Sequence, residues 1–318
     1  MPSVTEIVIR AQFPYWQAAL QQDLPRIRAG LIVLAGCGSS YYLAQSLACA
    51  FNAQGQAAVA VPGAEWARRP QNYVADTTDI LVVGLSRSGT TTETVQAIEA
   101  SRARGLRTFA ISCEPGSTIL AAADLAVCMT TDPQEGIVMS TSASLMFLAG
   151  LRMAGINLPA TVVQAAQSAM AGLDTGIGRL LPGRSHFVYL GAGVSYGIAT
   201  EGCLKLQEMS ISYSQAFHPM EYRHGPISLI DDRSLVVMLY SHDTAGEEAA
   251  LVRDLQSKGA LVIGVGGPGD LQIDLGLTDA AGALACLPAL QLLGEKVALS
   301  KNINSETPRH LTKVVVLQ

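Results

Sequence analysis

The sequence predicts an α/β protein that contains two copies of one domain, each a parallel sheet with helices on both faces. Short, continuous apolar runs alternate with segments of helical period, the pattern of a parallel sheet that is buried on both sides. The same motifs also recur in the same order. GCGSSY at residues 36–41 recurs as GAGVSY at residues 191–196, which is 155 residues later. The apolar runs near residues 80 and 107 likewise have counterparts near residues 234 and 260. Ordered recurrence at a nearly constant spacing indicates a duplication.

The elements of the first copy follow from the apolar runs. Strands are expected at residues 31–36, 57–62, 80–85, 107–112 and 125–130, with helices at 40–54 and 90–105. Before them, residues 1–25 are expected to hold an N-terminal helix. The chain then divides into a first domain at 26–158, a linker helix at 159–181, a second domain at 182–300 and a tail at 301–318.

Composition excludes several classes of protein. The 318 residues are 49% hydrophobic and carry a net charge of −5 with no basic run, so a sizeable core is expected and nucleic-acid binding is not. No apolar stretch is expected to reach the roughly 18 residues of a membrane helix, and the N-terminus lacks the pattern of a signal peptide. The six cysteines form no CxxC motif. We therefore expect a cytoplasmic protein with reduced thiols and no membrane partner.

A loop rich in hydroxyl groups follows the third predicted strand. In GLSRSGTTTE, residues 84–93, several Ser and Thr side chains surround Gly89 and Arg87. Helix N-terminal amides and hydroxyl donors favour an oxyanion, and phosphate is the natural guest. The alternative is simple helix capping, since residues 90–93 fit a capping box, but capping accounts for one Thr and the Glu only. The second copy has LYSHDTAGEE at this place, whose acidic residues would repel phosphate, so one phosphate site per chain is expected.

No cofactor or metal is predicted. Neither GCGSSY nor GAGVSY completes the dinucleotide-binding pattern GxGxxG, because the sixth position is Tyr41 or Tyr196, and no GxxxxGK[ST] occurs. His218 and His224 are six residues apart with no third ligand in sight, which is a poor metal site.

Three motifs together, GCGSSY, LSRSGTTTET and EGCLKLQEMS…EYRHGPISLID, resemble the tandem sugar isomerase (SIS) family. The chain is similar to the isomerase half of glucosamine-6-phosphate synthase and to stand-alone amino-sugar-phosphate deaminases. The resemblance implies two tandem SIS domains of the αβα type. It also implies a homodimer, and a C-terminal tail that folds over the active site.

The resemblance assigns roles residue by residue. The phosphate binders fall on Ser40, Ser86, Ser88 and Thr91, and Arg87, which replaces a Gln of the synthase, would add a charge to phosphate binding. The residues of the sugar pocket fall on Val138, Glu201 and Thr312. The catalytic groups fall on Lys205, Glu208, His224 and Lys313.

Each catalytic group has a role that chemistry supports. Glu201, Lys205 and Glu208 share one helix face by their i, i+4, i+7 spacing, and Glu208 is the candidate base that moves a proton between C1 and C2. The alternative is a solvated ion pair with a spare Glu. In the family the counterpart of His224 opens the sugar ring in a neighbouring subunit's site. The counterpart of Lys313 can form a Schiff base with the open ketose.

The expected activity is a phosphosugar isomerase and deaminase that converts an amino-sugar 6-phosphate and water into a ketose 6-phosphate and ammonia. The chain begins Met1-Pro2 without the synthase's glutaminase domain, which disfavours glutamine-dependent synthesis unless a separate subunit supplies ammonia. Ser142 stands where the synthase has a Lys, which favours a different sugar or a different reaction. Two alternatives stay open. One is a deglycase that cleaves a phosphorylated fructosamine, and the other is a sugar-phosphate sensor without catalysis.

Overall fold

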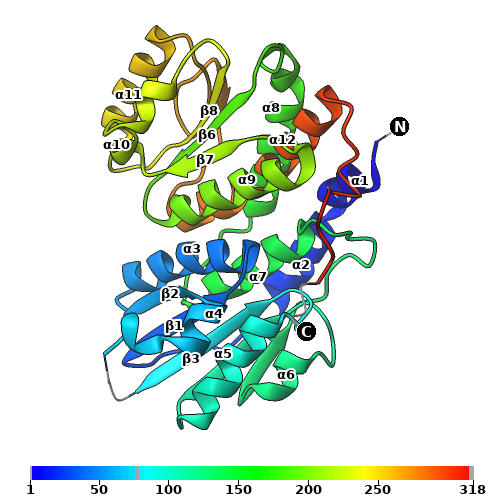
Figure 1. Cartoon of the computed structure of the whole chain (residues 1–318), viewed down its shortest axis with the longest axis vertical. Coiled ribbons are helices and arrows are strands. Elements are labelled where there is room, and N and C mark those ends of the chain that lie inside the picture. The colour runs from blue at the N-terminus through cyan, green and yellow to red at the C-terminus, as the bar shows by residue number, and fades with distance from the viewer. Residues whose placement is uncertain (1, 76–78, 315–318) are drawn as a thin grey trace. The chain divides into compact units, whose positions relative to one another are not determined.

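The computed structural model describes residues 2–75 and 79–314, which fold into two compact units (Figure 1). Of these residues, 12–158 and 312–314 form the first unit, and 2–11 and 159–311 form the second. Each unit contains one five-stranded sheet, and every pair of neighbouring strands is parallel. The predicted fold class and the predicted duplication are therefore confirmed.

The first sheet has the strand order β2-β1-β3-β4-β5. Its strands are β1 (Leu31–Gly36), β2 (Ala58–Pro62), β3 (Ile80–Ser86), β4 (Arg107–Ser112) and β5 (Leu125–Cys128). All five lie where the apolar runs predict them. The central strand β3 is buried along its whole length, as expected for a strand with helices on both faces.

Helices cover both faces of the first sheet. They are α2 (Phe13–Gln21), α3 (Ser39–Ala53), α4 (Gly63–Arg68), η1 (Pro70–Asn72), α5 (Thr92–Ala103), α6 (Thr118–Ala122) and α7 (Thr141–Met153). Alternate strand residues such as Val33 and Val82 pack with Trp66 of α4, Ile98 of α5 and Ile119 of α6 on one face. Helices α2, α3 and α7 form the other layer (Figure 1).

The second sheet repeats this plan. Its order β10-β9-β8-β6-β7, read backwards, matches that of the first sheet strand for strand. The strands are β6 (His186–Gly191), β7 (Ser214–Phe217), β8 (Ser234–Leu239), β9 (Leu261–Val265) and β10 (Leu271–Ile273). The surrounding helices are α8 (Val162–Gly176), η2 (Ile177–Arg179), α9 (Val194–Ser210), α10 (Pro219–Tyr222), η3 (Pro226–Leu229), α11 (Ala245–Ser257) and α12 (Asp279–Ser300).

The duplication is also visible in the backbone of the recurring glycine motif. Gly38 and Gly193 precede α3 and α9, and both have φ = 54° with ψ = −128° and −126° respectively, a conformation that only glycine adopts readily. A Cβ on Gly36 would lie 2.7 Å from the carbonyl carbon of Ser40, and a Cβ on Gly191 would lie 2.5 Å from the carbonyl oxygen of Ser195. The motif recurs because both glycines are needed for the same turn from strand to helix.

The N-terminal segment differs from the single helix that the sequence predicts. It holds two helices, α1 (Val4–Ala11) and α2, which begins at Phe13 with a proline in its first turn. Pro14 has no amide hydrogen, so the helical hydrogen-bond ladder cannot run through it without interruption. As a result α1 belongs to the second unit and α2 to the first.

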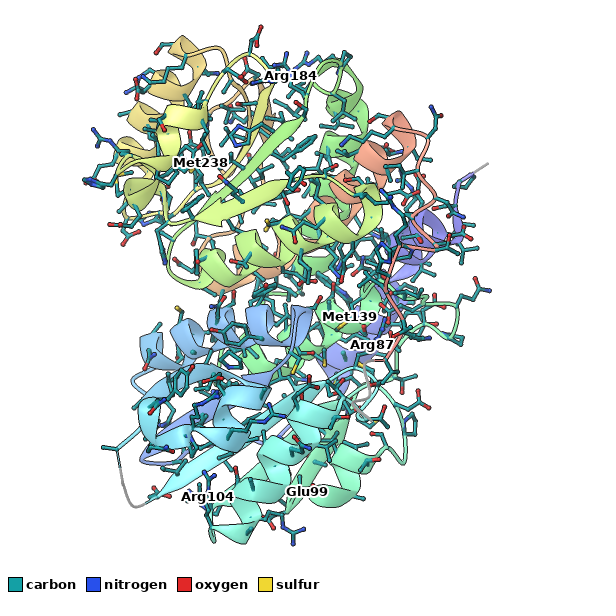
Figure 2. The ribbon with its side chains drawn as sticks, viewed as in Figure 1. Arg87, Glu99, Arg104, Met139, Arg184 and Met238 are labelled. Atoms are coloured by element: carbon teal, nitrogen blue, oxygen red, sulfur yellow. The ribbon has the colours of Figure 1, made fainter. Side chains whose placement is uncertain are left out.

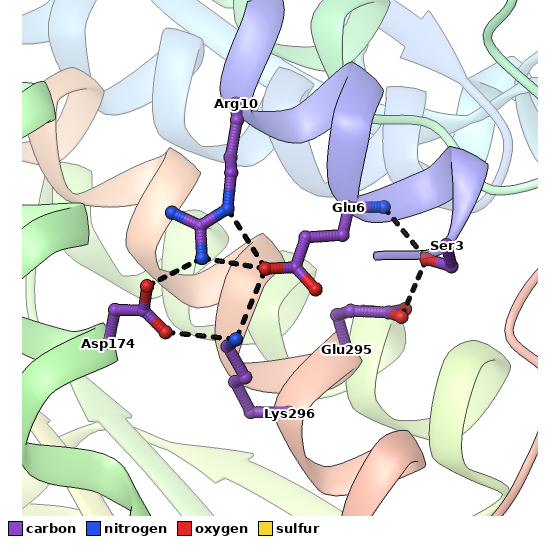
Figure 3. A network of polar contacts seen from close by, with 6 residues as sticks. All are labelled: Ser3, Glu6, Arg10, Asp174, Glu295 and Lys296. Atoms are coloured by element: carbon purple, nitrogen blue, oxygen red, sulfur yellow. Dashed lines mark hydrogen bonds and ion pairs between the residues drawn. The ribbon is translucent and has the colours of Figure 1, made fainter. Parts of the chain in front are cut away.

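Helix α1 is anchored to the second unit by a network of charged side chains (Figure 3). The Nη2 atom of Arg10 donates to Glu6 Oε1 at 2.7 Å and to Asp174 Oδ2 on α8 at 2.6 Å. Lys296 Nζ on α12 lies 3.1 Å from Glu6 and 2.9 Å from Asp174. Ser3 Oγ adds a hydrogen bond of 2.7 Å to Glu295 on α12. Two cations thus bridge two carboxylates from three helices.

Within the described residues, α12 is the one helix long and apolar enough to cross a membrane by length and composition. Of its apolar window, 89% is buried inside the protein, where the helix packs against α8 and α9. Its hydrophobicity is therefore explained by its place in the core of the second unit. The expectations of a cytoplasmic location and of no membrane or nucleic-acid partner stay predictions.

Candidate active site

The hydroxyl loop lies at the switch point of the first sheet. From β1 the chain crosses to β2 on one side, and β3 pairs with β1 on the other. Ligands of open parallel sheets bind outside the carboxyl ends of the strands at such a point. Helix α3 begins directly after β1, and helix α5 begins shortly after β3. Since parallel strands end at the same edge, two helix N-termini lie at this edge of the sheet.

The loop between β3 and α5 is held in one conformation by its own hydroxyls. Ser86 Oγ accepts a hydrogen bond from the amide of Gly89 at 3.1 Å and donates to Thr91 Oγ1 at 3.3 Å. Ser88 Oγ accepts from the amide of Thr90 at 3.3 Å. Gly89 has φ = 63°, and a Cβ there would lie 2.0 Å from Ser117 Oγ. The glycine therefore permits both the turn and a close approach to the neighbouring loop.

Helix capping does not account for these hydroxyls. The residue before the first turn of α5 is Thr91, and its side chain makes no capping hydrogen bond. Helix α5 thus begins one residue later than a capping box over residues 90–93 requires. Helix α3 likewise starts from Gly38, which has no side chain to cap it. Uncapped N-termini with hydroxyl donors nearby are a ready anion site.

Ser40, the fourth predicted phosphate binder, lies in the first turn of α3. It is buried, and its amide donates to the carbonyl of Cys37 at 3.2 Å. The structure thus places Ser40 at the end of β1 and Ser86, Ser88 and Thr91 at the end of β3, on adjacent strands of one sheet.

Arg87 joins the tail of the chain to the loop that precedes α7. Its guanidinium is buried, with Nη1 donating to the carbonyl of Gly136 at 3.0 Å and Nη2 donating to the carbonyl of Lys313 at 2.8 Å. Lys313 Nζ in turn donates to the carbonyl of Glu135 at 2.7 Å. Figure 2 shows Arg87 and Met139, from the loop before α7, labelled in the same region of the first unit. In this arrangement the charge of Arg87 is directed at backbone carbonyls of the tail and the loop.

Glu135 organises that loop, a role that the sequence analysis missed. Its buried Oε1 accepts from the amide of Ser140 at 2.5 Å and from the amide of Ser142 at 3.1 Å, at the start of α7. A carboxylate at a helix N-terminus is stabilised by the helix dipole. An acidic residue a few positions before the STS of residues 140–142 is the signal that could have revealed it. Val138, the predicted pocket residue of this loop, is buried.

The predicted acid–base residues lie on α9 of the second unit. Glu201 and Lys205 are completely buried, and Lys205 Nζ lies 3.5 Å from Glu201 Oε1 and 2.5 Å from Glu208 Oε2. The side chain of Glu208 is 20% exposed, so it is the member of the set that solvent or a ligand can reach. The alternative of a solvated ion pair is wrong for Glu201 and Lys205. A buried ammonium between two carboxylates is costly to place and costly to disrupt.

The two histidines of the second unit differ in their surroundings. His218 stacks on Tyr196 with ring centroids 3.9 Å apart, and burial lowers the pKa of its imidazole. His224 is exposed in the loop between α10 and η3, with its amide bonded to the carbonyl of Glu221. Within residues 2–75 and 79–314, no hydrogen bond or ion pair joins the side chain of His224 to another predicted site residue. Thr312 is exposed in the tail and donates to the carbonyl of Val314 at 2.8 Å.

Comparison with known proteins identifies similarity along nearly the whole chain. Residues 27–155 and 180–270 match the model of the SIS domain. The chain is 26% identical over 313 residues to the glutamine–fructose-6-phosphate aminotransferase (isomerizing) of Pyrobaculum aerophilum, covering 90% of this chain and 51% of that protein. The chain therefore spans about half the length of the curated relatives it matches.

Solved structures are similar over a greater share of their own length. The glucosamine-6-phosphate deaminase of Thermotoga maritima has 30% sequence identity and a TM-score of 0.88, covering 99% of this chain and 100% of the other. The tagatose-6-phosphate ketose/aldose isomerase of Escherichia coli has a TM-score of 0.81 at 23% identity, covering 99% of this chain and 96% of the other, and shows the fold alone.

Proposed function

Since this chain belongs to the SIS domain family, we propose that it is a phosphosugar isomerase that deaminates an amino-sugar 6-phosphate. The observation that carries the proposal is the hydroxyl loop after β3, whose Ser86, Ser88 and Gly89 shape an uncapped helix N-terminus at the switch point of the sheet. Such a site suits the dianionic phosphate of a sugar phosphate. The similarity to a deaminase along its whole length supports the choice of reaction.

The chemistry asks for one group that moves a proton between neighbouring carbons. In the open-chain amino sugar, Glu208 would remove the proton from C2 and return it to C1, which turns the C1 aldehyde and C2 amine into a C1 alcohol and a C2 imine. Net hydrolysis of this imine releases ammonia and leaves a ketose 6-phosphate. Lys205 Nζ, 2.5 Å from Glu208 Oε2, holds this carboxylate in a fixed orientation.

Two further groups complete the proposed reaction. His224 would protonate the ring oxygen to open the sugar, and we propose that it acts in the site of a second copy of the chain. Lys313 would attack C2 as an amine, forming a Schiff base that expels ammonia and is later hydrolysed by water. Its Nζ now donates to the carbonyl of Glu135, so the tail must release this hydrogen bond for the attack.

Ammonia release tests the proposal directly. Glucosamine 6-phosphate and galactosamine 6-phosphate are incubated with the wild type, with Glu208→Gln and with Glu99→Gln, an exposed glutamate on α5 that serves as the matched control. We expect release from one of the two sugars with the wild type and the control, and a loss of at least about 100-fold in Glu208→Gln.

If no ammonia is released, three further measurements distinguish the alternatives. Deuterium uptake from heavy water into fructose 6-phosphate without ammonia release would identify an isomerase that does not deaminate. Turnover of a 6-phosphorylated fructosamine would favour the deglycase. Stabilisation by fructose 6-phosphate without any turnover would leave a sensor and contradict the proposed function.

A further inference from the structure

The second unit contains a cavity at the place that corresponds to the hydroxyl loop of the first. Its volume is about 160 Å³. It is lined by Ser195 at the start of α9, by residues 239–242 after β8, and by the first turns of α12. Because both sheets have the same strand order, this is the switch point of the second sheet, where β6 pairs with β7 on one side and β8 on the other. Ligands of open parallel sheets bind at this position.

The lining residues are the counterparts of the predicted phosphate binders. Ser195 occupies in the second copy the place of Ser40, 155 residues earlier. In the second sheet, Leu239 pairs with Gly191. In the first sheet, Gly84 pairs with Ala35, so the next residue, Leu85, lies level with Gly36, the counterpart of Gly191. Tyr240, Ser241 and His242 therefore stand where Ser86, Arg87 and Ser88 stand in the first copy.

In the second copy, a backbone amide that could bind an anion is already hydrogen-bonded to a carboxylate of the chain itself. Buried Glu248 accepts a hydrogen bond from the amide of Ser241 at 2.8 Å through Oε2, and from Thr244 Oγ1 at 3.0 Å through Oε1. In either protonation state its carboxyl oxygen keeps this amide from an external anion. Asp279 contributes a carboxylate to the lining itself. The occupied amide and this carboxylate both disfavour phosphate.

The remaining walls favour a different ligand. The hydroxyl of Tyr240 donates to the carbonyl of Pro268 at 2.9 Å, and its ring lies so close to Gly267 that a Cβ there would be 2.5 Å from the ring. Tyr240 is thereby held in position, and it lines the cavity together with Asp279, Ser195 and Ser241. A carboxylate and an aromatic face attract an ammonium group, while serine hydroxyls pair with ligand hydroxyls.

We propose that this cavity is a second ligand site, which binds a small hydroxylated amine without a phosphate group, of the size of a hexosamine. The site goes beyond the proposed reaction and does not depend on it, because none of its lining residues is a predicted catalytic or phosphate-binding residue. The cavity holds the volume of about five water molecules, which suits a single small ring.

Calorimetric titration with glucosamine tests the proposal. It is carried out in saturating fructose 6-phosphate, which keeps glucosamine out of the predicted phosphate site. We expect one binding event per chain, weakened at least about tenfold in Asp279→Asn and abolished in Ala283→Leu, which fills the cavity. Asn is tolerated at the φ of 52° that residue 279 adopts, so the first variant keeps the backbone. Asp232→Asn, an exposed residue just before β8 at the opposite end of the strand, is the matched control.

Each outcome of the titration either supports or contradicts the proposed ligand site. Glucose, which lacks the ammonium, and inorganic phosphate serve as comparison ligands, and we expect both to bind at least about tenfold more weakly than glucosamine. Equal binding of glucose would contradict recognition of an amine, and competition by inorganic phosphate would contradict the exclusion of anions from the cavity. Absence of glucosamine binding, or binding that Asp279→Asn and Ala283→Leu leave unchanged, would overturn the site itself. None of these results bears on ammonia release by the wild type, so a failure of one proposal can be told apart from a failure of the other.

Discussion

Individual residues of the hydroxyl loop have separable roles, because some hold the loop in its conformation and others are proposed to contact a ligand. Ser86 and Gly89 hold the loop through hydrogen bonds and close packing. Ser88 is half-buried, and its Oγ accepts hydrogen bonds from the amide and the hydroxyl of Thr90. A substitution at Ser88 should therefore change binding, whereas one at Gly89 should change folding.

Ser88→Ala removes the hydroxyl that we propose donates to the phosphate of the substrate. A hydrogen bond to a charged group contributes about 1.5–3 kcal/mol, so KM should rise roughly 10- to 100-fold with little change in thermal stability. Steady-state kinetics on the amino-sugar phosphate that the ammonia assay identifies would measure this. Thr90→Ala, the exposed neighbour in the same loop, is the control, and an equal rise of KM in both variants would contradict a specific role for Ser88.

Gly89→Ala should destabilise the first unit. An alanine is strained by about 1–2 kcal/mol at a φ of 63°, and its Cβ would also collide with Ser117 Oγ at 2.0 Å. Gly116→Ala is the matched control, since Gly116 has a φ of 69° but open space around it. We expect Gly89→Ala to lose more stability than Gly116→Ala in urea unfolding.

Adding Ser117→Gly to Gly89→Ala should recover part of the loss, because it removes the atoms that collide. Glycine is tolerated at residue 117, the N-cap of α6. Equal losses in the two alanine variants would show that the backbone conformation alone, without the close approach, requires glycine at residue 89.

At the scale of elements, the two ends of the chain are tied down by polar contacts rather than by apolar packing alone. Helix α1 is held by the charge network with α8 and α12. The tail is held by Arg87 and by the amine of Lys313. Polar attachments respond to pH and to single substitutions, which makes both ends testable.

The attachment of α1 should weaken in acid. Burial raises the pKa of Glu6, but the hydrogen bonds from Arg10 and Lys296 outweigh it, so the pKa of Glu6 lies below its ordinary value of 4.5. The pKa of Asp174 is likewise below 3.8, since hydrogen bonds from Lys296 and Arg10 outweigh the effect of burial. A lowered carboxyl pKa stabilises the folded state above the ordinary value, and this stabilisation disappears as the pH falls through the lowered pKa.

The double variant Glu6→Gln, Asp174→Asn measures this contribution. The difference between its urea midpoint and that of the wild type should be full at neutral pH, begin to shrink near pH 4.5 and vanish in stronger acid. The same partners raise the pKa of Arg10 and Lys296, and their contribution is lost only in alkali. Asp254→Asn, which breaks an exposed pair with Lys258, should change the midpoint little at any pH. A constant difference down to pH 2 would contradict the assignment.

Arg87→Gln distinguishes two roles for this arginine. If it holds the tail, as its hydrogen bonds to Gly136 and Lys313 indicate, the variant should lower kcat several-fold, leave KM nearly unchanged and make the tail easier to cleave by protease. If it binds phosphate, as the sequence predicts, KM should rise instead. Arg87→Lys keeps the charge without the forked geometry and should behave like Arg87→Gln in the first case.

At the scale of the whole molecule, the sequence predicts the architecture well because the architecture depends on patterns that are repeated. Continuous apolar runs predict the strands of the first sheet, and the recurring glycine motif predicts the second sheet. The separation of α1 from α2 was missed, although Pro14 was a visible signal. The connections of Arg87 and Glu135 could not be predicted, since they join segments that only the folded chain brings together.

The candidate site is predictable to a different degree in its two parts. The hydroxyl loop is local, so its residue types and spacing suffice to propose a phosphate site. The burial of Glu201 and Lys205 is a property of the packed second unit, and the sequence alone left a solvated pair open. His224 is exposed, and the described residues show no contact between it and another predicted site residue. We propose that it acts in the site of a second copy of the chain.

Mixing two inactive variants tests that whole-molecule prediction. Glu208→Gln removes the proposed base, and His224→Asn removes the proposed ring-opening acid, so each homodimer should be inactive on a cyclic substrate. In a mixed dimer whose histidines cross to the neighbouring site, one site carries both substitutions and the other carries neither. Equal mixing with free exchange makes about half of the dimers mixed, each with one intact site, so roughly a quarter of the wild-type activity should return. Recovery requires exchange of subunits, and it should be absent when the variants are mixed under conditions that prevent exchange. If His224 serves its own chain, every site in the mixture lacks one group, and no activity should return at any ratio.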